Sequence, residues 1–403
     1  MDSNILEKID SYQLGKELQQ ARNRKGLTQE EAAKVIDVAR TTLVAIEKGE
    51  RRLKPIELIK LAKAYGQQIS DFVRPRPVLE PVRPQFRRSL QVSTDDPALD
   101  TALNNLEDLC RDYLELEQLT NSPIVSRYPA EYNIEGQNID RAAEFVALEE
   151  RSRLGLGDGP IPALRDVLEQ EVGLRIFYIY MPSKFSAMYF YNEQLGGCIG
   201  INSAHAKAHV RQRWSLAHEY GHFLAHRSHA LIENESKRQP DTEKFANSFA
   251  QFFLMPSTGI IRRYNKTVQV KKDFTISDLR DFANYYKVSL DALTQRLEDL
   301  KLVPLGTLES LKDNWKQIRA IQKELDQKTS QTTQNPEEPM IPNRYKYLAM
   351  EALYEGLISE GQFARFMRVD RAEGVLIATL PGQTEFTDLK SDNDISLLQS
   401  GND

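Results

Sequence analysis

The chain has 403 residues, of which 40% are hydrophobic and 28% charged, and its net charge is −5. That balance predicts two to four globular domains joined by polar linkers, and it argues against a disordered or fibrous protein. No run of about 18 apolar residues occurs, so we expect no membrane-spanning segment. Two cysteines, Cys110 and Cys198, are too few for a disulfide framework. With an acidic N-terminus unlike a secretory signal, this predicts a cytoplasmic protein.

The charge is unevenly distributed along the chain. Residues 14–90 contain 17 lysines and arginines against 9 acidic residues, whereas residues 1–13 carry −2 and the remainder −11. A basic segment ahead of an acidic body predicts an anionic partner for the N-terminal part alone.

Residues 14–73 have the pattern of short amphipathic helices. Thr28 followed three residues later by Glu31 forms a capping box that begins the second helix. Gly49 is a typical residue for ending the third helix, and Pro55 for beginning the fourth. This part of the chain is therefore predicted to be all-α.

The remaining elements follow in order. The Pro- and Arg-rich residues 74–90 predict an extended linker, and residues 96–119 a single strong helix. The polar residues 328–342 predict a second linker, before a small helical tail at 343–380. Further helices are expected at 141–154, 161–172, 211–226, 243–254 and twice within 276–302, with short strands at 174–180, 188–191 and 197–202.

All six histidines fall between residues 205 and 229, which is unlike a distribution for packing alone. His218 and His222 belong to the segment HEYGH, and spacing i, i+4 puts both imidazoles on one face of a helix. Two imidazoles so placed can bind one Zn²⁺, and Glu219 is positioned to act as general base on a water at that metal.

A catalytic zinc needs a third protein ligand. His226 lies one helical turn, about 5.4 Å, beyond His222, which is too far along the axis to complete the same site. A carboxylate at the start of the next helix is the better candidate. The residues favour Glu243, with Asp241 as the second choice.

Three segments resemble the ImmA/IrrE family of metallopeptidases over about residues 125–305: LGLGDGPIPALRDVLEQEVGLRIF, SLAHEYGHFLAHR and EKFANSFAQFFLMP. The resemblance implies a zincin-like α+β fold, a Zn²⁺ cofactor and cleavage of helix-turn-helix repressors. It also implies that His218, His222 and Glu243 are the zinc ligands and that Glu219 is the catalytic acid and base. Many members have a second acidic residue where this chain has Phe245, so Glu243 is the only matching carboxylate.

Two further features of such an active site are expected. Zincins pair an edge strand with the extended substrate, and the strand at 197–202 is the candidate for that role. The tetrahedral intermediate also needs a hydrogen-bond donor for its oxyanion. His205, His209, Tyr189 and Tyr191 are all open candidates for it.

The segment TQEEAAKVIDVARTTLVAIEKGE resembles the Cro/repressor-type (XRE) helix-turn-helix over about residues 14–73. In this class the N-terminal residues of the recognition helix contact base edges in the major groove of DNA. The resemblance implies base contacts by Arg40, Thr41 and Ala45. The residues implied to contact phosphate are Gln29, Lys48, Arg51 and Arg52.

The predicted fold is therefore multidomain and mainly α, with an all-α helix-turn-helix domain, an α+β zincin-like domain with a small sheet, and a small helical C-terminal domain. The predicted divisions are 1–75 (DNA-binding), 76–124 (linker and connecting helix), 125–310 (peptidase and following helices), 311–342 (helix and linker), 343–380 (helical tail) and 381–403 (disordered tail).

The predicted function is a regulator that binds double-stranded DNA and cleaves a partner protein, a repressor or operon product, in a stress or phage-related response. A homodimer is left open. Two alternatives remain: a zinc-sensing transcription factor without enzymatic activity, and the protease of a toxin–antitoxin or anti-phage defence module.

Overall fold

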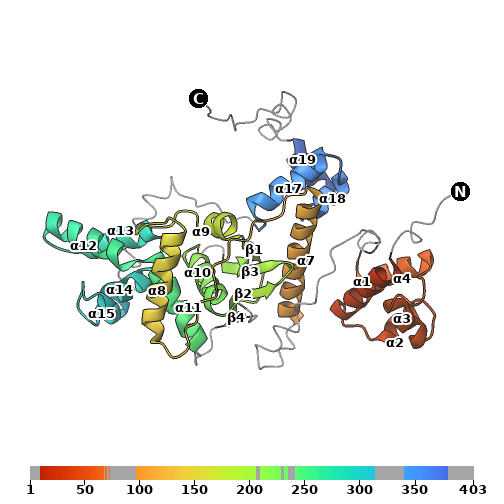
Figure 1. Ribbon diagram of the computed structural model, residues 1–403, viewed down its shortest axis with the longest axis horizontal. Coiled ribbons are helices and arrows are strands. Elements are labelled where there is room, and N and C mark those ends of the chain that lie inside the picture. The colour runs from red at the N-terminus through yellow and green to blue at the C-terminus, as the bar shows by residue number, and fades with distance from the viewer. Residues whose placement is uncertain are drawn as a thin grey trace, which may run out of the picture. The chain divides into compact units, whose positions relative to one another are not determined.

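The computed structural model in Figure 1 describes residues 10–67, 69, 72, 97–205, 209–227, 231–234, 241–313 and 340–379. The chain divides into two compact units, residues 1–80 and 81–403. Among the described residues, no helix is long and apolar enough to cross a membrane. Most of the two predicted linkers, the predicted N-cap Asp96 and the C-terminal tail lie outside the described residues.

The first unit is a bundle of short helices around an apolar core that includes Leu18, Leu43 and Leu61, all fully buried. The capping box of Thr28 and Glu31 is present, so the polar groups at that helix end are satisfied locally. The helices are α1 (Ser11–Arg24), α2 (Gln29–Val35), α3 (Arg40–Glu47) and α4 (Pro55–Tyr65).

Helices α1 and α3 approach each other closely because of one glycine and one buried ion pair. A Cβ on Gly15 would lie 2.5 Å from the Ile46 carbonyl oxygen, so only glycine fits there. Arg22 of α1 donates to both carboxylate oxygens of the buried Glu47, at 2.6 and 3.1 Å. This pair fixes the position of α3, the predicted recognition helix.

The second unit is built on a four-stranded sheet with strand order β1-β3-β2-β4. Strands β1 (Arg175–Ile179) and β3 (Gly196–Asn202) are parallel, while β2 (Phe185–Asn192) is antiparallel to both β3 and β4 (Leu231–Asn234). Strand β3 is therefore central and paired on both sides. The prediction that residues 197–202 form an edge strand was wrong, and β4 occupies an edge instead.

Helix α10 (His209–Ala225) packs on one face of this sheet against β2 and β3. Helix α11 (Asp241–Leu254) packs beside α10, and α8 (Ile139–Arg153) packs on α11 (Figure 1). Inward-facing residues of the strands join these helices in one continuous core.

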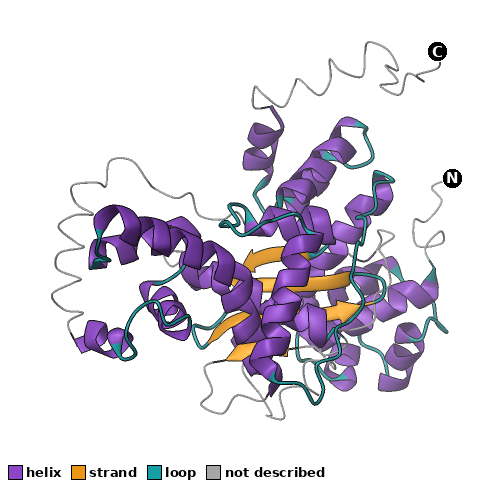
Figure 2. Cartoon of the chain, turned by 60° about the vertical axis from the view of Figure 1, so that its left-hand side comes forward, coloured by secondary structure: helices purple, strands orange, loops and turns teal. Residues whose placement is uncertain are grey.

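The other face of the sheet is covered by α7 (Pro97–Leu119) and α17 (Asn343–Tyr354), which pack against each other (Figure 1). Figure 2 shows the strands of the sheet surrounded by helices. Tyr113 of α7 and Tyr345 of α17 both meet the ring of Phe177 edge-on. The Glu117 carboxylate of α7 accepts from Arg175 of β1 at 2.6 Å and from Arg344 of α17 at 2.9 Å. Because both faces are covered, β1 and β3 are buried along their whole length.

Other elements depart from the predicted pattern in detail. Residues 161–172 are helical only from Leu164, and their last turn is a π-helix, Leu168–Val172. A long helix that the sequence pattern did not predict begins directly after Pro256. The remaining helices are α9 (Leu164–Val167), α12 (Ser257–Lys271), α13 (Ile276–Tyr286), α14 (Leu290–Asp299), α15 (Thr307–Asp313), α18 (Glu360–Phe366) and α19 (Arg371–Thr379).

Candidate metal centre

The candidate site forms where α10 and α11 come closest. A Cβ on Gly221 would lie 3.0 Å from the Phe249 ring and 3.2 Å from the Cα of Ala246, so glycine allows the two helices this short separation. Phe245 and Phe249 of α11 are fully buried beside it. The first turn of α11, which carries Glu243, is thereby brought to the histidine face of α10.

Three potential metal donors converge at this point. The Nε2 atoms of His218 and His222 lie 3.0 Å apart. The Glu243 carboxylate places one oxygen 3.2 Å from the His218 nitrogen and the other 3.4 Å from the His222 nitrogen. Both histidines are 1% exposed, whereas the Glu243 side chain is 22% exposed, so the site is buried yet reachable from solvent on one side.

These separations match what a tetrahedral zinc site requires. Ligand bonds of about 2.0–2.2 Å imply roughly 3.3–3.6 Å between neighbouring donor atoms, close to the spacings found here. Two imidazoles and one carboxylate are also a donor set typical of catalytic zinc. The residues present therefore fit the metal that the sequence predicts, and the three are a compact cluster of ligand atoms within 4.8 Å of one another.

Asn247 orients one of the imidazoles. Its Oδ1 lies 3.0 Å from Nδ1 of His218. An amide oxygen can only accept, so Nδ1 carries the proton and the Nε2 lone pair faces His222 and Glu243. Sequence reasoning missed this residue. Its spacing of four from Glu243 puts both on one face of α11, which was the available signal.

We expect Asn247→Ala to weaken zinc binding by about 10–100-fold, because loss of such an orienting partner has that effect at other metal sites. Zinc affinity can be measured by competition with a chelating dye. Asn247→Asp keeps an acceptor at the same place and should bind zinc more tightly than the alanine variant. Equal affinity for the wild type and the alanine variant would contradict this role.

Glu219 and Tyr220 of the HEYGH segment have different surroundings. Glu219 adjoins His218 on α10 and is fully buried. The Tyr220 hydroxyl donates to the carboxylate of Glu150 on α8, and Arg153 donates to the same hydroxyl at 3.1 Å. Burial raises the pKa of Tyr220 well above its usual value, so it stays protonated. Tyr220 thus anchors α10 to α8.

The charge state of Glu243 suits a ligand. Burial would raise the pKa of its carboxyl, but the adjacent imidazoles of His218 and His222 outweigh that effect and hold the pKa well below its ordinary value. The carboxylate is therefore ionised at neutral pH, as a metal ligand must be.

Comparison with known proteins agrees with this arrangement. Residues 169–298 match the family model of the IrrE N-terminal-like peptidase domain, and residues 18–72 match a helix-turn-helix family. This chain joins a helix-turn-helix domain to an IrrE N-terminal-like domain of the metallopeptidase-like kind. No curated protein matches the chain. A solved structure, ComR from Streptococcus suis, aligns with 96% of this chain and 97% of its own at 11% identity, but its TM-score is 0.16, so that likeness supports no inference.

The other ligand candidates in the IrrE-like domain are not among the clustered donors. The Asp241 carboxylate is 77% exposed and pairs with Lys244 at 3.0 Å. The ring of His226 packs edge-on against Phe245, with centroids 5.8 Å apart. Glu243 is thus the carboxylate that the fold brings to His218 and His222.

The four candidates for an oxyanion donor also have different surroundings. The Tyr189 hydroxyl donates to the Arg227 carbonyl at 2.8 Å, so its proton is already used. His209 is the first residue of α10, roughly 13 Å before His218 along the helix axis, which is too far to act at the same centre. The side chain of His205 lies outside the described residues. Tyr191 is half-buried beside Tyr128 and stays an open candidate.

The predicted DNA contacts of the helix-turn-helix domain also differ from one another in their surroundings. Arg40, Thr41, Lys48 and Arg52 are exposed, whereas Gln29, Ala45 and Arg51 are half-buried. Arg40 donates to the Gln29 side chain at 3.3 Å, and Gln29 donates to Glu47 at 3.0 Å. Arg51 forms a two-bond pair with Glu57 at 2.9 and 3.0 Å, which leaves it less available to a phosphate.

Proposed function

We propose that this protein is a DNA-binding regulator whose IrrE-like domain is a zinc-dependent endopeptidase. The proposed substrate is a partner protein, either a helix-turn-helix repressor or a product of the same operon. The observation that carries the proposal is the convergence of His218, His222 and Glu243 at tetrahedral spacing beside the buried carboxyl of Glu219.

The role proposed for each residue of the site follows from the surroundings of its side chain. His218, His222 and Glu243 would hold the zinc ion, and Asn247 would keep His218 in the tautomer that binds it. When bound, zinc supplies a Lewis acid that polarises a carbonyl and acidifies water. Glu219 then takes a proton from the attacking water and delivers it to the departing amine.

The sheet order suggests where an extended peptide would bind. Strand β4 pairs with β2 on one side, and among the described strands none pairs with its other side. An exposed edge offers unpaired backbone groups to which a substrate strand can hydrogen-bond. We therefore assign the substrate-pairing role proposed for zincin edge strands to Leu231–Asn234 rather than to β3.

The buried carboxyl of Glu219 favours an enzyme over a zinc sensor without activity. A sensing site needs the metal ligands alone, and burial of an additional carboxyl is unfavourable unless it has a use. The defence-module alternative predicts the same chemistry on a different protein. Identification of the cleaved protein, beginning with the products of neighbouring genes, separates it from the repressor hypothesis.

We expect Arg40→Ala to weaken binding to the promoter of the protein's own operon by about 1–3 kcal/mol, because Arg40 begins the recognition helix and Gln29 holds it in place. Fluorescence anisotropy with labelled duplex measures this. Affinity should also fall steeply with salt concentration, as expected when lysines and arginines displace counterions from phosphates.

The matched control is Arg262→Ala, which removes an exposed arginine from α12, outside the helix-turn-helix domain. It should bind DNA as the wild type does. Binding that is independent of salt, or an equal loss in both variants, would sink the DNA-contact prediction.

A further inference from the structure

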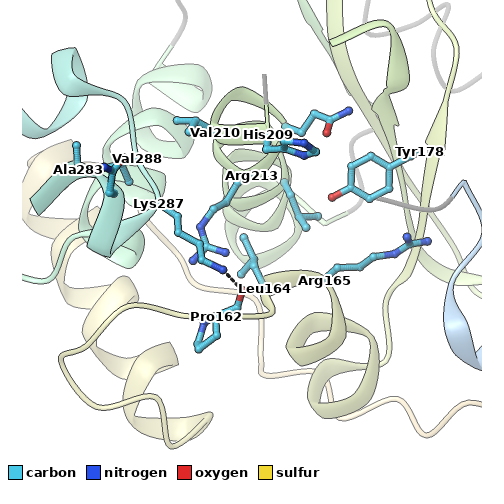
Figure 3. A pocket seen from close by; sticks show the side chains of 13 residues that line it. Pro162, Leu164, Arg165, Tyr178, His209, Val210, Arg213, Ala283, Lys287 and Val288 are labelled. Carbon is cyan, nitrogen blue, oxygen red and sulfur yellow. Dashed lines mark hydrogen bonds between the residues drawn. The ribbon is translucent and has the colours of Figure 1, made fainter. Parts of the chain in front are cut away.

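The larger unit has a cavity to which no role has been assigned so far, and Figure 3 shows it from close by. Its volume is about 350 Å³, within the range of small-molecule sites. The start of α9, strand β1, the first two turns of α10 and the C-terminal end of α13 contribute its walls. None of His218, His222 and Glu243 lines it, so it is separate from the candidate metal centre.

The charged side chains that line this cavity are all cationic. They are Arg165, Arg213 and Lys287, which come from three different elements, and no carboxylate is among the lining residues. Arg165 is partly neutralised by Glu169 at 3.2 Å, just outside the lining. Lys287 donates to the backbone carbonyl of Pro162 at 3.2 Å, which leaves its full charge beside the cavity (Figure 3). The cavity therefore has a positive potential and favours an anion.

Gln212 supplies a second, independent sign of a ligand. Its side chain is 4% exposed, and its Nε2 donates to the Asn202 carbonyl at 3.0 Å. Since that carbonyl can only accept, the orientation of the amide is fixed. In the part of the chain that the structure describes, its Oε1 has no hydrogen-bond partner. A buried acceptor of this kind is unfavourable unless a donor reaches it, and Gln212 is one of the residues that line the cavity.

Most of the other residues in the wall are apolar or aromatic. Leu164, Leu216 and Val288 are buried, and so is the ring of Tyr178, which lies under the Arg165 guanidinium at 5.0 Å. A ligand that satisfied only the charged and polar groups would leave these surfaces facing water. The lining thus favours a ligand that has an apolar part beside its anionic group.

We propose that this cavity binds a small organic anion. Its carboxylate or phosphate group lies against Lys287 and Arg213, its apolar or aromatic body contacts Leu164 and Val288, and an N–H or O–H group donates to Gln212. The proposal does not depend on peptide hydrolysis. It does place the ligand against Gln212 of α10, six residues before His218. The proposed ligand site and the candidate metal centre therefore share one helix.

Isothermal titration calorimetry on the full chain tests the proposal with defined probes. 4-Hydroxyphenylacetate and 4-aminophenyl phosphate each carry a ring, an anionic group and a donor, and they distinguish a carboxylate from a phosphate source. Tyrosol lacks the charge and inorganic phosphate lacks the ring. We expect at least one of the first two to bind at least about tenfold more tightly than both tyrosol and inorganic phosphate. No binding of either organic anion at up to about 10 mM would overturn the proposal.

Two variants locate the binding. Lys287→Gln removes the charge and should raise the Kd at least about tenfold. Val210→Trp enlarges a rim residue that is 36% exposed, so it should block the cavity without disturbing the core. The matched control is Lys272→Gln, since Lys272 is also an exposed lysine that ends a helix in the left-handed conformation, with φ 61° against 53°. Binding unchanged in both test variants, or reduced equally by Lys272→Gln, would refute the assignment.

Discussion

Glu219→Gln is expected to lower the rate of peptide hydrolysis by about 10²–10⁴-fold while the protein keeps its zinc. The substitution preserves the size of the side chain and removes only its ability to take and return a proton. Because Glu219 is fully buried beside His218 and is not among the three clustered donors, the metal ligands should be undisturbed.

Mass spectrometry identifies newly formed protein termini in cells that produce either the wild type or the variant, and the two sets of termini are compared. Glu149→Gln, at an exposed position on α8, is the matched control and should cleave normally. Zinc content of each purified protein is determined alongside. If the Glu219 variant produced the same new termini as the wild type, another residue would have to be the base.

Loss of a metal ligand is expected to weaken zinc binding by a factor comparable with the loss of rate in Glu219→Gln. The wild type should hold one equivalent of zinc, and His222→Ala should lose it on dialysis. Glu243→Gln should bind zinc at least about 100-fold more weakly than the wild type. This loss equals or exceeds the largest loss expected when an orienting residue such as Asn247 is removed. Both substitutions remove a donor from the cluster in which neighbouring atoms lie 3.0–3.4 Å apart.

Asp241→Asn provides the control for Glu243. Both acids lie in the first turn of α11, but the Asp241 side chain is 77% exposed and turned to Lys244. Each substitution removes one negative charge from the same helix end, so a general electrostatic effect would weaken zinc binding equally in the two variants. Metal content that fell only in Asp241→Asn would show that the third ligand has been misassigned.

The clustering of His218, His222 and Glu243 was predictable because the information for it is local. HEYGH fixes two donors by helical spacing alone, and Glu243 lies in the first turn of the next helix, whose phenylalanines had to be buried. Gly221 then determines how near the two helices can lie. The helix-turn-helix domain was predictable for the same reason, since its caps and turns are short-range signals.

The sheet was less predictable because strand order depends on pairing between distant residues. Nothing in residues 197–202 reveals that β1 lies on one side and β2 on the other, and β4 has only four residues. Helix α12 was missed because it buries little: Gly259 and Ile260 are its buried residues, so no apolar stripe marks it. The cavity, built from four separate segments, has no sequence signature at all.

The carboxylate of Glu117, which two arginines share, limits how the domains of such proteins can be exchanged by recombination. It accepts hydrogen bonds from Arg175 of the sheet and from Arg344, which lies on a helix more than 160 residues later in the chain. One face of the sheet in the IrrE-like domain is thus covered by helices from both sides of the segment that carries HEYGH. A cut near residues 124 and 310 would remove those helices, strip aromatic cover from Phe177 and leave Arg175 as a buried charge without its carboxylate. Recombination can therefore transfer this IrrE-like domain intact only together with its flanking helices.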